Sequence, residues 1–198
     1  MDDIRNKVNE KIKEYSNKEY LNGYIKNEFL TDDGNADILL KINSKEDIFD
    51  SKTVGNQLDL NKDIYEYIEK KASLLDNDIK LHLKIISNEL NLHDIEKIKH
   101  IINEHYAIEL YKTQRKYRRH SSKLVSLIIS GILFILSYIL IAFNFQSKVF
   151  IEIVGFLFSF CLWHSIETYI YTLTDIKYKR EEITQKLLMS VNLENKKK

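Results

Sequence analysis

The hydropathy pattern is dominated by an uncharged run of 20 residues from Leu124 to Phe143. A helix of this length, at about 1.5 Å per residue, spans the roughly 30 Å hydrocarbon core of a bilayer. A buried helix of a water-soluble protein usually keeps a polar face, whereas the polar side chains of this run are three serines and one tyrosine. The pattern therefore predicts a first transmembrane helix over residues 124–145.

A second, less regular apolar run predicts another transmembrane helix over residues 149–172. Its uncharged core, residues 153–163, has only 11 residues, a length that also suits a re-entrant segment. The two glutamates of the run lie near its ends, where a carboxylate reaches the interface most easily. Three aromatic side chains form the belt expected at a membrane–water interface: Trp163, Tyr169 and Tyr171. Together these features favour a full span.

Basic residues flank both runs and set the expected orientation. Residues 112–123 carry six lysines and arginines, residues 173–186 carry four, and the connecting residues 144–148 carry one. The positive-inside rule then predicts two cytoplasmic tails, a basic juxtamembrane helix over 112–123 and an external turn over 146–148. Five side chains are expected to form a basic cluster at the membrane surface: Arg115, Lys116, Arg118, Arg119 and Lys123.

Polar residues recur on one face of each predicted span. At 100° per residue, those of the first span form one narrow stripe: Ser126, Ser130, Ser137 and Asn144. In an antiparallel hairpin, polar residues of the second span lie at matching depths: Glu167, His164, Ser159 and Glu152. Such groups satisfy one another where water is absent, so the pattern predicts a polar packing seam. The alternative is a pore or proton path in an oligomer, because ionisable residues inside a membrane are often functional.

The rest of the pattern predicts a small α+β domain with few strands in residues 1–111. The clearest strand lies between residues 79 and 85, where apolar residues alternate with Lys80, His82 and Lys84. Residues 36–42 form a second strand candidate, and residues 57–60 a weaker third. This cytoplasmic domain would precede the two-helix hairpin.

Helical spacing of apolar residues predicts the remaining elements. It extends over residues 2–30 in two pieces, over 62–75 behind the capping residue Asn61, and from residue 93 or 94 onward. The last helix either breaks near residues 103–106 or continues into the membrane. Residues 173–198 are expected to form a cytoplasmic helix and tail, with an apolar stripe: Ile176, Ile183, Leu187 and Val191.

Charge and cysteine content add modest limits. Residues 1–111 carry 23 acidic and 16 basic side chains, a net −7, whereas the remaining residues carry 6 and 14, a net +8. The total of +1 argues against a nucleic-acid partner. Cys161, the only cysteine, suits a reducing compartment, and the polar N-terminus predicts no cleavable signal peptide.

The histidines are the obvious candidates for metal ligation, but their spacing fails. His100 and His105 resemble an inverted zincin motif, with one residue too many between His100 and Glu104. The five glycines are scattered, so no phosphate-binding loop is expected. Cys161 lies in a predicted span, where it cannot be an exposed nucleophile. We therefore expect no metal, no cofactor and no catalytic residue.

These observations favour an integral membrane protein that acts as a membrane-tethered cytoplasmic interaction or regulatory module without catalysis. Its layout is typical of small bacterial inner-membrane proteins, with both termini cytoplasmic. The expected partners are the lipid bilayer and an unidentified protein or a second copy of the chain. Two other functions stay open: an oligomeric channel or membrane-disrupting effector that uses the polar seam, and a membrane-bound enzyme that depends on His100 or His120.

Overall fold

A computed structural model describes residues 2–15, 23, 28–53, 55–144 and 148–194 of the chain. These residues belong to two compact units. The sheet unit comprises Met1–Ala107 and Thr184–Lys198, and the long-helix unit comprises Ile108–Ile183. Helices combined with one small sheet agree with the predicted α+β class. The sheet unit thus combines residues from both ends of the chain.

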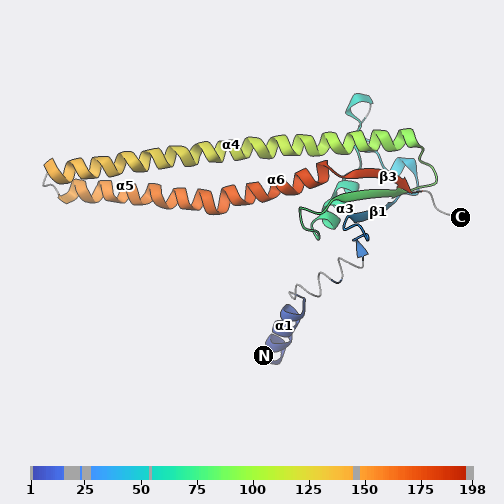
Figure 1. The fold of residues 1–198 in the computed structure, drawn as a ribbon, viewed down its shortest axis with the longest axis horizontal. Helices are drawn as coiled ribbons and strands as arrows, with labels where there is room; N and C mark the ends of the chain where they lie inside the picture. The colour runs from blue at the N-terminus through green and yellow to red at the C-terminus, as the bar shows by residue number, and fades with distance from the viewer. Residues whose placement is uncertain (1, 16–22, 24–27, 54, 145–147, 195–198) are drawn as a thin grey trace. The chain divides into compact units, whose positions relative to one another are not determined.

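The sheet has three parallel strands in the order β1-β2-β3 (Figure 1). They are β1 (Ala36–Lys41), β2 (Leu81–Ile86) and β3 (Ser190–Glu194). The strands predicted over residues 36–42 and 79–85 are thus confirmed to within two residues. Parallel neighbours require a crossover connection. Helix α3 (Lys62–Ala72) lies in the first connection, and all the long helices lie in the second.

One face of the sheet carries the core of this unit. The apolar residues of β2 alternate inward as its sequence predicts, and Leu83 and Ile85 are fully buried. Helix α3 begins at Asn61, whose side chain accepts a hydrogen bond from the Asp63 N–H. Its apolar positions at helical spacing are buried: Ile64, Tyr65, Ile68 and Ala72. The predicted amphipathic helix is therefore confirmed, although it ends three residues earlier than residue 75.

Strand β3 corrects the prediction for the C-terminal segment. Helix α6 ends at Leu187 and Val191 lies in β3, buried and in register with Leu83 of β2. The helical prediction rests on a spacing of four from Ile183 through residue 187 to Val191. The same segment also alternates with period two, and short apolar segments suit either periodicity. Tertiary pairing with a strand more than 100 positions earlier decides between them.

The weak strand prediction over residues 57–60 is wrong. Residues Gly55–Gln57 form a short 3-10 helix, η2, and Leu60 makes a single antiparallel bridge with Phe49. Gly55 has φ = +62°, a left-handed conformation that glycine adopts without strain and that interrupts an extended run. Another 3-10 helix, η1 (Lys45–Asp47), begins at a capping box formed by Ser44 and Asp47.

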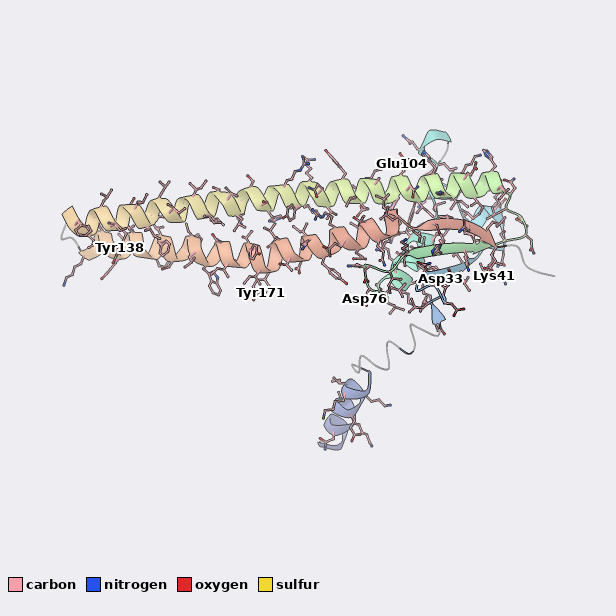
Figure 2. All side chains as sticks on the ribbon, viewed as in Figure 1. Asp33, Lys41, Asp76, Glu104, Tyr138 and Tyr171 are labelled. Carbon is pink, nitrogen blue, oxygen red and sulfur yellow. The ribbon has the colours of Figure 1, made fainter. Side chains whose placement is uncertain are left out.

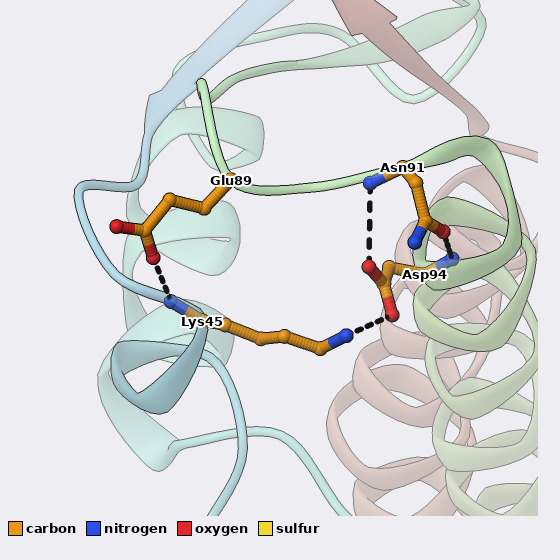
Figure 3. A network of polar contacts seen from close by, with 4 residues as sticks. All are labelled: Lys45, Glu89, Asn91 and Asp94. Carbon is orange, nitrogen blue, oxygen red and sulfur yellow. Dashed lines mark hydrogen bonds and ion pairs between the residues drawn. The ribbon is translucent and has the colours of Figure 1, made fainter.

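Helix α4 (Leu92–Asn144) runs for 53 residues, so the expected alternative of a break near residues 103–106 does not occur. A polar network holds its first turn (Figure 3). The Asp94 carboxylate accepts the Asn91 N–H at 3.2 Å, the Asn91 side chain accepts the Asp94 N–H at 2.9 Å, and Lys45 Nζ lies 2.6 Å from Asp94. The Lys45 hydrogen bond keeps the pKa of the buried Asp94 below its ordinary value. The Lys45 N–H donates to Glu89.

The other helices are α1 (Asp2–Tyr15), α5 (Lys148–Glu167), the π-helical segment η3 (Thr168–Leu173) and α6 (Thr174–Leu187). Helix α1 is the first of the two pieces expected over residues 2–30. The second piece falls almost wholly outside the described residues.

Candidate functional site

Two stretches of helix are long and apolar enough to cross a membrane, one within Leu92–Phe143 and one within Lys148–Leu187. The first contains the predicted span over 124–145 as far as residue 143, and the second contains the whole predicted span over 149–172. Only 6% of the most apolar window of each is buried, whereas the core helix of a water-soluble protein would be mostly buried. Large side chains such as Ile132, Phe143 and Phe156 are more than half exposed. Length, composition and exposure together agree with membrane spans.

Helices α4 and α5 run antiparallel within the long-helix unit. A Cβ placed on Gly131 would lie 3.7 Å from the Cβ of Cys161, and one placed on Gly155 would lie 3.9 Å from the ring of Tyr138. Figure 2 shows the two helices side by side and labels Tyr138. The less exposed residues of α4 recur at alternating spacings of three and four: Leu124, Leu127, Gly131 and Phe134. This is the spacing of two packed helices, and small residues let their backbones approach closely.

The residues of the predicted polar seam lie in several environments. Ser126, Glu152 and Ser159 are exposed, and Ser130 and Ser137 are half-buried. The hydroxyls of Ser137 and Ser159 donate to carbonyl oxygens of their own helices, those of Leu133 and Gly155. The side chain of Asn144 lies outside the described part of the structure.

His164 and Glu167 are the members of this seam that the structure brings together. His164 Nδ1 lies 2.8 Å from a Glu167 carboxylate oxygen, and both residues belong to α5. Pairing of the other seam residues across the two helices stays a prediction.

The π-helical segment changes which face of the second helix is buried. Thr168 and Leu173 are both buried, although five residues separate them. In a regular α-helix they would point 140° apart, at 100° per residue. Hydrogen bonds from residue i to i+5 widen the turn and bring such positions to one side. The register of α6 after η3 therefore differs from the one that continuous α-helical spacing would give.

A groove of about 790 Å³ lies between the basic part of α4 and the start of α6, entirely within the long-helix unit. We call it the basic groove and define it by the residues that line it: Glu109, Lys112, Thr113, Arg115, Lys116, Arg119, Asp175, Ile176 and Lys179. Three members of the predicted basic cluster line it, whereas Arg118 and Lys123 do not. The sequence-based cluster also missed Lys112 and Lys179. Lys112 lies four positions before Lys116, about one helical turn, and this spacing could have placed it in the cluster. No feature of the sequence points to Lys179.

Side chains from both helices hold this region together. The Arg180 guanidinium lies 5.4 Å from the centre of the Tyr117 ring and donates to the side-chain oxygen of Gln114 at 3.3 Å. Lys112 donates to Glu109 at 3.2 Å. Arg115, Lys116, Arg119 and Lys179 are exposed, and no described carboxylate lies within ion-pair distance of them.

The sheet unit presents polar pairs on the face of the sheet opposite its core. Lys84 of β2 bonds to Asp37 of β1, and the hydrogen bond raises the pKa of that lysine. His82 of β2 lies 2.6 Å from the hydroxyl of Ser190 in β3. Each pair joins neighbouring strands.

The histidines considered as metal ligands are dispersed. His100 lies 3.9 Å from Glu104, at the limit of an ion pair, and His105 stacks on Tyr65 with ring centres 3.9 Å apart. Over the described ranges, no group of three His, Cys, Asp or Glu side chains is placed to hold a metal ion.

Comparison with known proteins gives no relatives: no family model, no curated protein and no solved structure matches the chain.

Proposed function

We propose that this chain is a membrane-anchored module whose two apolar helices form a transmembrane hairpin and whose sheet unit acts in the cytoplasm without catalysis. The observation that carries this proposal is the composition of the sheet. Strands β1 and β2 precede both apolar helices in the chain, and β3 follows them. Yet β2 and β3 are hydrogen-bonded neighbours.

Strand pairing constrains how such a chain crosses a bilayer. Residues 81–86 and 190–194 must share one aqueous compartment for their backbone groups to pair. A chain that crosses once in α4 must therefore cross back in α5 before β3 can join the sheet. An even number of crossings, two here, satisfies this condition, and a re-entrant second segment after a full first span does not. This constraint on the number of crossings does not depend on the distribution of charge.

The distribution of charge supports the cytoplasm as that compartment. The basic groove and the residues around it carry most of the lysines and arginines next to the apolar helices, while Lys148 is the one lysine between them. Short basic flanks of this kind stay on the cytoplasmic side. The cell membrane of a bacterium is the membrane we propose.

Single-cysteine labelling tests the proposed topology. In a Cys161→Ala background, cysteine is introduced at Glu66 in α3, at Lys148 at the start of α5, or at Asn192 in β3, all of which are exposed. A membrane-impermeant maleimide should label the Lys148 variant in intact cells, and the other two variants only after permeabilisation. Labelling of the Glu66 and Asn192 variants on opposite sides would contradict the proposal.

An oligomeric pore is the second candidate, and the hydrogen-bonded His164 and Glu167 favour it. Ionisable side chains inside a span often mark ion or proton paths. In that case Glu167→Gln together with Glu152→Gln should abolish an ion leak that wild-type protein causes in vesicles. A wild-type protein that causes no leak would remove this candidate and leave the anchored module.

A further inference from the structure

We propose that the basic groove binds the phosphate-bearing headgroup of an anionic phospholipid. This inference rests on the proposed function, because a groove that never meets a membrane has no access to such a lipid. It assigns a ligand to residues that otherwise serve only to orient the helices. It also separates two kinds of basic residue beside the membrane, those that line the groove and those that do not.

The charge of the groove suits a phosphate ligand. Five of its side chains are cationic and two are carboxylates, which leaves a net formal charge of +3. Lys112 is already paired with Glu109, but Arg115, Lys116, Arg119 and Lys179 keep donors for a ligand. Arginine presents a planar fork that bonds two phosphate oxygens at once, and lysine adds a compact charge. A neutral headgroup would leave this charge uncompensated.

The position of the groove along α4 suits a lipid. Arg119 precedes the uncharged run at Leu124 by five residues, about 7.5 Å at the helical rise of 1.5 Å per residue. The polar headgroup layer is roughly 5–7.5 Å thick on each side of the hydrocarbon core. The end of the groove at Arg119 therefore lies at the outer edge of the headgroup layer when the run beginning at Leu124 fills the bilayer. Basic pockets between transmembrane helices on the cytoplasmic side bind anionic headgroups in the same way.

The groove runs along α4, away from the bilayer in the proposed topology. Lys112 lies seven positions before Arg119, about 10.5 Å further along the helix. Arg119 is therefore the groove cation of α4 nearest the headgroup layer. Cardiolipin, an anionic phospholipid with two phosphates, is the probe of choice because its charge is opposite to that of the groove.

Neighbouring residues outside the groove provide matched controls. Arg118 lies one position before Arg119 on α4 and is also exposed, but it does not line the groove. Lys177 lies two positions before Lys179 on α6, is also exposed and does not line the groove either. Arg119→Gln and Arg118→Gln therefore remove the same charge from nearly the same place, as do Lys179→Gln and Lys177→Gln. All four side chains are exposed, so folding should be retained.

The experiment measures binding of cardiolipin to the full chain in neutral phosphatidylcholine nanodiscs, by native mass spectrometry. We expect Arg119→Gln and Lys179→Gln each to weaken binding about fivefold or more, and Arg118→Gln and Lys177→Gln to change it less than twofold. Equal losses in all four variants would mean that the surface attracts lipid through charge alone, and would overturn the inference. Inorganic pyrophosphate, added to nanodiscs without anionic lipid, tests a soluble source of phosphate. If it binds as tightly as cardiolipin with the same dependence on Arg119, the lipid assignment is wrong.

Cell membranes that contain the protein distinguish failure of this inference from failure of the proposed function. Protein that alkaline carbonate extracts from membranes is not integral, and that result would contradict the transmembrane hairpin itself. Protein that stays in the membrane but binds cardiolipin no better than phosphatidylcholine would overturn only the lipid site.

Discussion

Replacing Gly131 with cysteine should allow a disulfide with Cys161, the only cysteine in the chain. The Cβ atoms of the two residues would lie 3.7 Å apart. Disulfides have Cβ–Cβ distances of roughly 3.5–4.5 Å, with a mean near 3.8 Å. The two backbones therefore already lie at a suitable distance for the bond. Cys161 is buried against α4, which keeps its thiol close to position 131. The cross-link therefore tests the register of the two helices directly.

The assay counts free thiols after oxidation. Membranes containing the Gly131→Cys variant are treated with copper phenanthroline, denatured, and alkylated with a maleimide coupled to polyethylene glycol. A protein with the disulfide takes up no polymer, whereas reduced protein takes up two. Ile132→Cys is the matched control, because it lies 100° further around α4 and is 53% exposed. We expect most of the Gly131→Cys protein to be cross-linked and most of the Ile132→Cys protein to remain free.

Equal alkylation of the two variants would refute the packing of α4 on α5. A cross-link in the Ile132 variant alone would mean that α4 is rotated by about one residue relative to α5. A cross-linked species of twice the mass on a non-reducing gel would mean that the thiols meet between two copies. Only a monomeric disulfide at position 131 agrees with the antiparallel pair within one chain.

Three further predictions concern the sheet unit. Val191→Ala removes two buried carbons and should lower the free energy of unfolding by about 2 kcal/mol. Hydrogen exchange of the β2 amides should then be about 30-fold faster. The exposed Asn192→Ala substitution should leave the exchange rates of these amides unchanged. Equal exchange in both variants would remove β3 from the sheet. Asp94→Asn should cost about 1.5–3 kcal/mol at pH 7 in a thermal melt. The folded-state pKa of Asp94 is lowered, so its stabilisation is present above its ordinary pKa near 4 and is lost as the pH falls below that value. The difference between wild type and variant should therefore shrink below pH ~4, and a constant difference would contradict the role of the charge. Finally, a fragment of residues 1–111 alone should be poorly folded, which narrow amide dispersion in its nuclear magnetic resonance spectrum would show. Joining this fragment to residues 184–198 through a flexible linker should restore the fold. A well-dispersed spectrum of the shorter fragment would contradict this.

The last of these predictions reverses what the sequence suggests. The pattern predicts a domain complete at residue 111, because nothing near that point signals a missing strand. The structure supplies two interactions from the far end of the chain. The Gln185 side chain donates to the carbonyl oxygens of Asp76 and Ile79, both at 2.8 Å, and Val191 pairs beside Leu83. Both depend on residues more than 100 positions away, which local periodicity cannot reveal.

Where local periodicity and burial agree, the sequence predicts the fold well. Strand β2 alternates without an error, and α3 places its apolar residues at helical spacing behind a capping asparagine. The two apolar helices follow from length and composition alone. These elements are determined by the residues within them, so no knowledge of the tertiary structure is required.

The basic groove was predictable only in part. Its contribution from α4 follows from spacings of three and four among Lys112, Lys116 and Arg119. Its contribution from α6 depends on the π-helical segment, because η3 changes the angle at which Lys179 emerges. Insertions of this kind have no reliable sequence signal. Charge counting therefore groups Arg118 with Arg119, although only Arg119 lines the groove.

The order of elements also links membrane insertion to folding in the proposed topology. Strand β3 follows both apolar helices, so the sheet closes only after the second helix has returned the chain to the side of β2. The second helix carries Glu152, His164 and Glu167 and is the less favourable of the two to insert. Burial of Val191 and Met189 in the sheet unit, each worth roughly 1.5–3 kcal/mol, is available only to chains in which that crossing has succeeded. In that topology, the sheet therefore stabilises the weaker span from outside the membrane.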